Sequence, residues 1–101
     1  MLFRSVAKSD VVIANPTHFA VALLYDRNVA DAPQVMAKGA DQVAFRIREI
    51  ARENDVPIVE NRPLARALYA ETDVGDIIPI EYINAIVTIY TQIDYLNKRK
   101  I

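Results

Sequence analysis

Two apolar segments only four residues apart restrict the fold more than any other feature of this chain. The first covers residues 11–14 and the second residues 19–25, and both have the composition of buried strands. A parallel crossover needs a dozen or more residues, so these two strands are antiparallel if they are neighbours. Both faces of the second strand are apolar at period two, which favours a central strand covered on both sides.

The rest of the chain alternates between strand and helix patterns. We expect strands at 34–37 and 56–60, and helices from 38–41 to about 54–55, over 63–71 and from Pro79 onward. The first helix has an apolar stripe of Val43, Ile47, Ile50 and Ala51, and the last has one of Ile83, Ile86, Tyr90, Ile93 and Asn97, with Val87 and Ile89 beside it. The third and fourth strands flank a helix, so we expect them to be parallel.

The predicted fold class is α/β, with a mixed four-stranded sheet surrounded by helices in one small domain. That domain is expected to cover residues 10–101, and residues 1–9 are weakly patterned and interpreted as a lead-in from an upstream linker. The chain has 101 residues, of which 52% are hydrophobic, which is enough for a packed core.

Composition excludes several classes of function. The net charge is −1 with both signs interleaved, so a general nucleic-acid surface is not expected. The one basic cluster, residues 98–100, fits the end of a helix. Without Cys, and with a single His, the chain has no disulfide and no metal site that can be recognised. No apolar segment is long enough to span a bilayer, so this chain alone is expected to be a soluble cytoplasmic domain.

The bond between Asn15 and Pro16 has unusual chemistry available to it. An Asn usually degrades when the next backbone nitrogen attacks its side chain, but Pro16 has no N–H and closes that route. The reverse attack remains open, in which the Asn15 side-chain nitrogen attacks its own main-chain carbonyl carbon. A succinimide forms, and the chain breaks before Pro16 with proximity supplying much of the advantage.

The neighbouring residues suit this reaction. His18 can accept a proton from the attacking amide or donate one to the departing nitrogen. Thr17 can hydrogen-bond the carbonyl oxygen or simply hold the turn. Asn-Pro-Thr is also an ordinary turn sequence, and on the residues alone a structural turn stays open as the alternative.

Three other groups of residues suggest alternative functions. Lys38 and Gly39 precede a helix, where backbone N–H groups can hold a phosphate, although one Gly does not make a P-loop. Arg62 and Arg66 can bind the carboxylate of a partner, or belong to a solvated helix face. A hydrolase using His18 lacks a nucleophile and an orienting group. A small-molecule or phosphate-binding α/β module therefore remains one alternative.

Several segments resemble one family of type III export proteins. VVIANPTHFAVALLYD is similar to the Asn-Pro-Thr-His segment of the FlhB, YscU and SpaS family, and the resemblance continues through APQVMAKGAD, IREIARENDVPIVEN, PLARALY and VGDIIPIEY. It covers roughly residues 11–85. The AKGAD and PLARALY segments are more like the flagellar branch than the injectisome branch, which stays as the alternative.

The resemblance implies a function for the reactive turn. It implies self-cleavage between Asn15 and Pro16, assisted by His18 and Thr17, in a single turnover without a cofactor, so the chain is not a turnover enzyme. It also implies the cytoplasmic C-terminal domain of a bacterial inner-membrane protein whose transmembrane helices are absent here. The resemblance further implies that this domain switches the class of exported substrate. The implied partners are export substrates and their chaperones, a length-control ruler protein and other export-gate components, and Lys38, Gly39 and Asp41 become exposed interaction surface.

Overall fold

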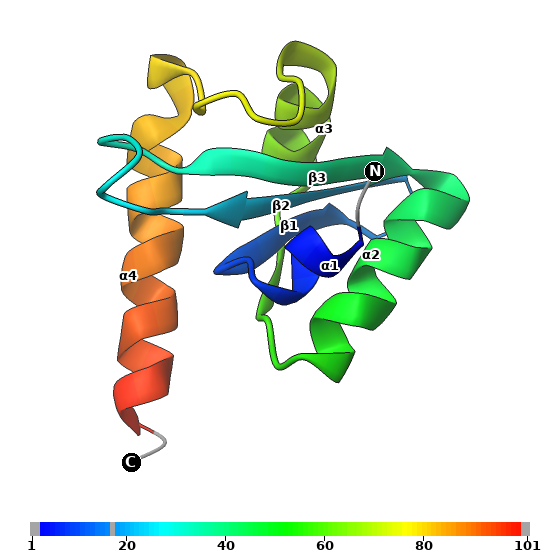
Figure 1. Ribbon diagram of the computed structural model, residues 1–101, viewed down its shortest axis with the longest axis horizontal. Helices are drawn as coiled ribbons and strands as arrows, with labels where there is room; N and C mark the ends of the chain where they lie inside the picture. The colour runs from blue at the N-terminus through cyan, green and yellow to red at the C-terminus, as the bar shows by residue number, and fades with distance from the viewer. Residues whose placement is uncertain (1–2, 17, 100–101) are drawn as a thin grey trace.

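The computed structural model describes residues 3–16 and 18–99, with side-chain surroundings described as far as Asp94. Four strands form one sheet in the order β3-β2-β1-β4 (Figure 1). The strands are β1 (Val11–Asn15), β2 (Phe19–Leu24), β3 (Gln34–Ala40) and β4 (Ile58–Glu60). The antiparallel pairing of β1 with β2 is confirmed. So is the mixed four-stranded α/β architecture.

The third and fourth strands run in the same direction without touching. β3 is antiparallel to β2, and β4 is parallel to β1. The predicted parallel direction is therefore correct, but the helix between β3 and β4 carries the chain across the whole sheet. This crossover places β4 and the helix that follows it beside the end of β1.

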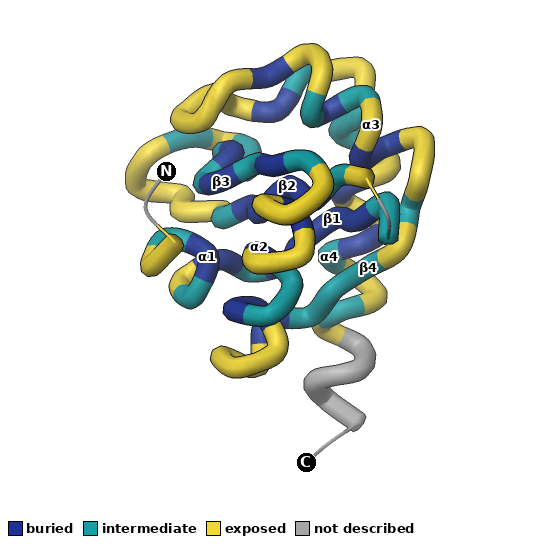
Figure 2. The backbone as a smooth tube through the Cα atoms, turned by 90° about the vertical axis from the view of Figure 1, so that its right-hand side faces the viewer, coloured by how far each residue is buried: buried dark blue, intermediate teal, exposed yellow. Residues whose placement is uncertain are grey.

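Helices cover both faces of the sheet, as the apolar strand faces predict (Figure 1). The short α1 and the long α2 lie on one face, and α3 and α4 lie on the other. The bounds are α1 (Arg4–Ala7), α2 (Asp41–Glu53), α3 (Arg62–Glu71) and α4 (Ile83–Arg99), with a 3₁₀ turn η1 (Ile80–Tyr82) leading into α4. Figure 2 shows that buried residues concentrate in the strands, with exposed residues on the outer surfaces.

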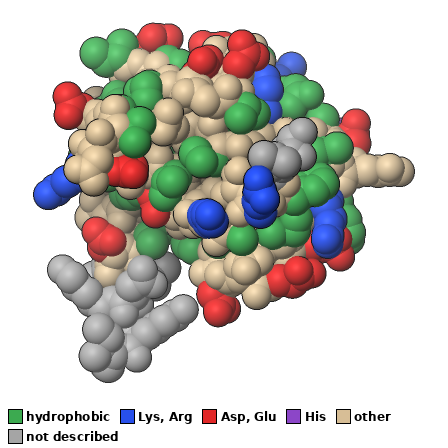
Figure 3. Space-filling view, in the orientation of Figure 1, with side chains coloured by type: hydrophobic (Ala, Val, Ile, Leu, Met, Phe, Trp, Pro, Cys, Tyr) green, Lys and Arg blue, Asp and Glu red, His purple; other side chains and the backbone are tan. Residues whose placement is uncertain are grey.

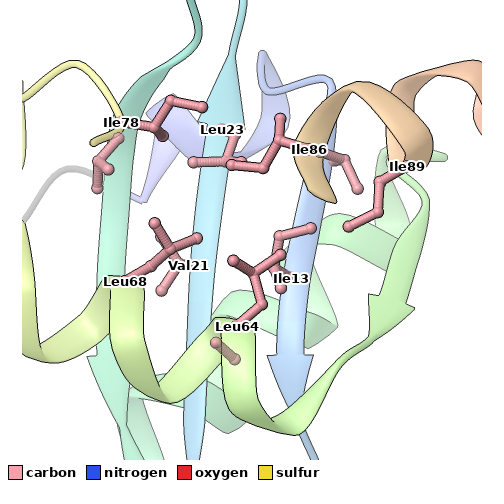
Figure 4. Close-up of a cluster of buried hydrophobic side chains, with 11 residues drawn as sticks. Ile13, Val21, Leu23, Leu64, Leu68, Ile78, Ile86 and Ile89 are labelled. Atoms are coloured by element: carbon pink, nitrogen blue, oxygen red, sulfur yellow. The ribbon is translucent and has the colours of Figure 1, made fainter. Parts of the chain in front are cut away.

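The core consists of two layers because alternate residues of the strands point to opposite faces. Ile13, Val21 and Leu23 pack against α3 and α4 (Figure 4). Val12 packs with α1 and α2 on the other face. The side chains of Ile13, Val21, Leu23 and Val12 are all fully buried.

Several element predictions need correction. β3 extends three residues beyond Ala37, and β4 begins only at Ile58. In α2 the buried position is Ala44, whereas Val43 is 38% exposed. In α4, Val87 is exposed and the core contacts come from Ile86 and Ile89, with Ile83, Tyr90 and Ile93 partly buried against them. The side chain of Asn97 lies outside the described surroundings.

The weakly patterned start of the chain also carries structure. Residues 4–7 form α1, and the Val6 side chain is fully buried in the layer that contains α2. A helix of four residues contains too few positions to show a periodic pattern. The origin of residues 1–9 as an upstream linker remains a prediction.

Candidate functional site

The Asn-Pro-Thr-His segment connects β1 to β2 at the right-hand end of these strands in Figure 1. Asn15 is the last residue of β1 and pairs with Phe19, the first residue of β2. The backbone N–H of His18 donates to the carbonyl oxygen of Asn15 at 3.0 Å and closes a four-residue turn. Asn15 and Pro16 are partly buried. Thr17 lies outside the described residues, and its predicted role stays a prediction.

The acceptor of the hydrogen bond that closes the turn is the carbonyl oxygen of the Asn15–Pro16 peptide bond. The Asn15 carbonyl carbon is the atom that a side-chain amide would attack, and its oxygen would gain negative charge in that reaction. An N–H already aimed at this oxygen favours that charge. The turn therefore has a hydrogen-bond donor in place at the Asn15 carbonyl oxygen.

The His18 side chain is exposed to water at 62% and lies next to Asp41. Its Nδ1 atom is 4.0 Å from Asp41 Oδ1, and the Asp41 backbone N–H donates to the His18 carbonyl oxygen at 2.9 Å. The ladder between β2 and β3 ends at the pair Phe19 and Ala40, so the next residues beyond it on each strand meet. Asp41 was predicted as exposed interaction surface, and its side chain is indeed exposed.

Lys38 and Gly39 do not form the exposed surface that the sequence predicts. Lys38 belongs to β3, and its Nζ donates to the carbonyl oxygens of Tyr69 at 2.9 Å and Thr72 at 2.6 Å, at the end of α3. Gly39 is buried, and a Cβ atom there would lie 2.8 Å from Cβ of Val43. The Lys38 ammonium is thus engaged on the α3 face of the sheet, away from the α2 N-terminus, which argues against the phosphate site.

An aromatic contact links the turn to α3. The Phe19 ring stacks on the Tyr69 ring with centroids 4.6 Å apart, and Lys38 Nζ lies 4.9 Å from the Tyr69 centroid. Phe19 directly follows His18, so this stack anchors the downstream side of the turn. Sequence reasoning missed this contact because nothing local relates residues 19 and 69.

Arg62 and Arg66 line an open hollow on α3 that also includes Asn15. The structure therefore brings these two predicted residues to the Asn-Pro turn, although nothing in the sequence relates them. The connection runs through Asn61, whose backbone N–H donates to the Ala14 carbonyl oxygen at 3.0 Å and whose side chain caps α3 by accepting from Leu64. An Asn two residues before Pro63 is a helix-start signal that could have located this cap.

A side-chain hydrogen bond also links α4 to the residue before β1. The Tyr90 hydroxyl donates to Asp10 Oδ2 at 2.9 Å, and the Tyr25 backbone N–H donates to the same oxygen at 2.7 Å. Burial, followed by the charge of Asp10, raises the pKa of Tyr90 well above its usual range. This contact joins residues 80 positions apart and also had no signal in the sequence.

The surface offers neither a charged field nor a metal cluster in the part of the chain that the structure describes. Positive and negative side chains are interspersed over the face in Figure 3. Among residues 3–16 and 18–99, no group of three or more His, Cys, Asp or Glu residues can hold a metal ion. None of the described helices has the length and apolar character needed to cross a membrane.

Comparison with known proteins agrees with this architecture. The model of the FlhB HrpN YscU SpaS family matches residues 1–93. The flagellar biosynthetic protein FlhB of Bacillus subtilis is 46% identical over 100 residues, which are 99% of this chain and 28% of that protein. The chain thus spans about a quarter of the length of the curated relatives it matches.

Two solved structures are similar over most of the chain. The cytoplasmic domain of FlhB from Shewanella putrefaciens superimposes with a TM-score of 0.92 at 40% identity, covering 97% of this chain and 75% of that one. The EscU C-terminal domain, solved as an Asn-to-Asp variant, gives a TM-score of 0.86 at 30% identity and covers 92% of this chain and 99% of that one. Further EscU structures replace an Asn, the Pro next to it, and a His two positions after that Pro.

Proposed function

Because this chain belongs to the FlhB, HrpN, YscU and SpaS family, we propose that it is a type III export domain that cuts its own backbone between Asn15 and Pro16. Cleavage would then take part in the switch from one class of export substrate to another. The observation that carries this proposal is the closed turn, in which an Asn-Pro bond sits between two strands and its carbonyl oxygen accepts from His18. Each chain performs the reaction once, so the domain is not a turnover enzyme.

The proposed reaction needs only groups of the turn itself. The Asn15 side-chain nitrogen attacks the Asn15 carbonyl carbon and passes a proton to His18. The bond from that carbon to the Pro16 nitrogen then breaks, and the nitrogen leaves as a secondary amine after receiving the proton. The products are a C-terminal succinimide and a new N-terminus at Pro16, and water later opens the succinimide ring.

Two features of the turn support this chemistry. Pro16 disfavours the helical conformation of Asn15 and closes the competing side reaction of asparagine. The His18 N–H, 3.0 Å from the Asn15 oxygen, can stabilise the oxyanion of the tetrahedral intermediate. The EscU substitutions have the same order and spacing as Asn15, Pro16 and His18.

The fold would keep the two fragments together after cleavage. β1 belongs to the upstream fragment, while both of its neighbours, β2 and β4, belong to the downstream fragment. Val11, Val12 and Ile13 are fully buried, and each contributes about 1.5–3 kcal/mol to the association. The expected change is therefore local, with the closed turn replaced by two chain ends.

The test follows cleavage in newly synthesised protein by intact mass. The wild-type chain should convert into fragments 1–15 and 16–101, and a chain that stays intact at neutral pH refutes the proposal. Asn15→Ala should abolish cleavage because it removes the nucleophile. His18→Ala should slow it by roughly 10²-fold or more if His18 transfers the proton. Asn28→Ala is the matched control, because it removes an exposed Asn of the loop before β3 that is followed by Val and not by Pro.

The wider role rests on the family. The flagellar export apparatus is the favoured setting, since FlhB relatives are 38–55% identical to this chain. An injectisome counterpart with the same role is the second candidate, favoured by the structural likeness to EscU. We infer a position on the cytoplasmic face of the bacterial inner membrane, with export substrates, their chaperones, a ruler protein and other gate components as partners.

Arg62 and Arg66 are the residues proposed to contact such partners. Both side chains line the hollow that includes Asn15, and Arg62 is 72% exposed. Cleavage would alter one wall of this hollow, so a partner carboxylate bound there would sense the state of the turn. Binding of a candidate substrate to the cleaved domain and to the Asn15→Ala domain, each with and without Arg66→Gln, tests this assignment.

A further inference from the structure

We propose that Asp41 is a positioning residue for self-cleavage, which it serves by orienting the His18 imidazole. The inference rests on the proposed function and adds the first residue of α2 to the reaction. Two contacts carry it, namely the 4.0 Å approach of Asp41 Oδ1 to His18 Nδ1 and the hydrogen bond from the Asp41 N–H to the His18 carbonyl oxygen. Asp41 thus contacts both the side chain and the backbone of His18.

The sheet fixes this pair in place. β2 and β3 pair without interruption from Phe19 and Ala40 through four registered positions, and His18 and Asp41 are the next residues beyond the ladder. The chain turns sharply at Asp41 into α2, because Gly39 has no side chain and Val43 packs directly over it. The Asp41 backbone is therefore held beside His18, within reach of its imidazole.

Asp41 adopts a conformation that most residues avoid. Its φ of 51° is in the left-handed region, which Asp and Asn tolerate better than other residues with a side chain. Residues held in this region often belong to functional sites.

A carboxylate near Nδ1 favours the imidazole form that carries its proton on Nδ1. The Nε2 atom is then unprotonated and available to accept the proton from the Asn15 amide. This effect acts through His18, so it should vanish when the imidazole is absent.

The first experiment measures cleavage rates in newly synthesised wild-type chain, Asp41→Asn, His18→Ala and the double variant. Asp41→Asn keeps the residue shape and the tolerance for positive φ. It should slow cleavage about two- to fivefold, as expected for an exposed pair, and high salt should reduce the difference. In the His18→Ala chain the same substitution should have no further effect.

The control is Asp55→Asn. Asp55 is also exposed and has a φ of 58°, but it follows the opposite end of α2. An unchanged rate for Asp41→Asn, an equal slowing by Asp55→Asn, or the same slowing in the His18→Ala chain would overturn the positioning role.

A second experiment does not depend on cleavage. The chain has a single His, so its ¹⁵N chemical shifts in the Asn15→Ala protein report directly which nitrogen carries the proton. The wild-type carboxylate should favour Nδ1–H, and Asp41→Asn should move the population toward Nε2–H. Shifts that do not change on substitution refute the inference. A wild-type chain that never cleaves refutes the proposed function instead, and the two failures are thereby distinguished.

Discussion

Lys38 provides the sharpest test of how the structure revises the sequence-based assignment. The sequence predicts it as exposed partner-binding surface, whereas its ammonium donates to two carbonyl oxygens at the C-terminal end of α3 and its side chain is only 24% exposed. We consider the substitution Lys38→Met, which keeps an unbranched apolar stem and removes the charge. If Lys38 binds a partner, Lys38→Met should weaken partner binding and leave the free energy of unfolding unchanged. If Lys38 caps α3, the substitution should lower the free energy of unfolding and leave partner binding unchanged.

The size of the effect follows from the contacts that are lost. A hydrogen bond from a charged group contributes about 1.5–3 kcal/mol, and the contact with the Tyr69 ring adds roughly 0.5–1 kcal/mol. The nearby Asp73 side chain is 92% exposed and adds little. Water can reach the end of α3 and replace part of the hydrogen bonding that Lys38 provides to the two carbonyl oxygens. We therefore expect Lys38→Met to reduce the free energy of unfolding by about 2–3 kcal/mol.

Urea unfolding measures this change most directly. Both chains should carry Asn15→Ala, so that a single covalent species unfolds and a two-state analysis applies. The melting temperature should fall by roughly 10–20 °C. Lys8→Met is the matched control, because Lys8 is exposed, and it should stay within about 0.5 kcal/mol of the parent. A midpoint for Lys38→Met equal to that of Lys8→Met would refute the capping role.

Three further substitutions, and Val29→Ala as a control, test the fold by urea unfolding. Gly39→Ala should cost about 1–3 kcal/mol, because the added Cβ collides with α2. Val6→Ala should cost about 1–3 kcal/mol because Val6 is fully buried, while Val29→Ala, at a site 60% exposed, should cost under about 0.5 kcal/mol. Burial and the charge of Asp10 raise the pKa of Tyr90, so the unfolded chain loses this proton first as pH rises. The free energy of unfolding should therefore fall above about pH 10, by at most ~1.4 kcal/mol per pH unit. In the Tyr90→Phe protein it should fall less steeply. Equal slopes in the two proteins would contradict the raised pKa of Tyr90.

The strands were predictable because their signal is local. A strand buried on both faces needs apolar residues at every position, and residues 11–14 and 19–24 satisfy this in the sequence itself. The errors arose where a distant contact decided the outcome. Lys38 and Gly39 resemble a turn before a helix, but both lie in β3. Position 39 needs a glycine because a Cβ atom there would collide with Val43. The surrounding sequence does not reveal that requirement.

The candidate site also combines a local feature, which the sequence reveals, with distant residues, which it does not. The proposed reaction of the Asn15–Pro16 bond depends on two adjacent residues, so it can be inferred from the sequence. The groups around it come from elsewhere: Asp41 arrives through the register of β2 with β3, and Arg66 arrives because β4 pairs with β1. Register and strand order are properties of the whole sheet, so neither neighbour could be assigned to the turn from residue types and spacing.

The fragment in which each of these residues lies determines what cleavage can change. If the bond before Pro16 breaks, His18 and Asp41 both remain in the downstream fragment and stay paired by the ladder from Phe19 onward. Asn15 remains with β1, facing the hollow that Arg66 lines. The hydrogen bond from the His18 N–H to the Asn15 oxygen is the contact that joins the two sides across the cut. Its loss would let the new ends separate while both ladders persist, so a partner that distinguishes the two states must contact the surface around this turn.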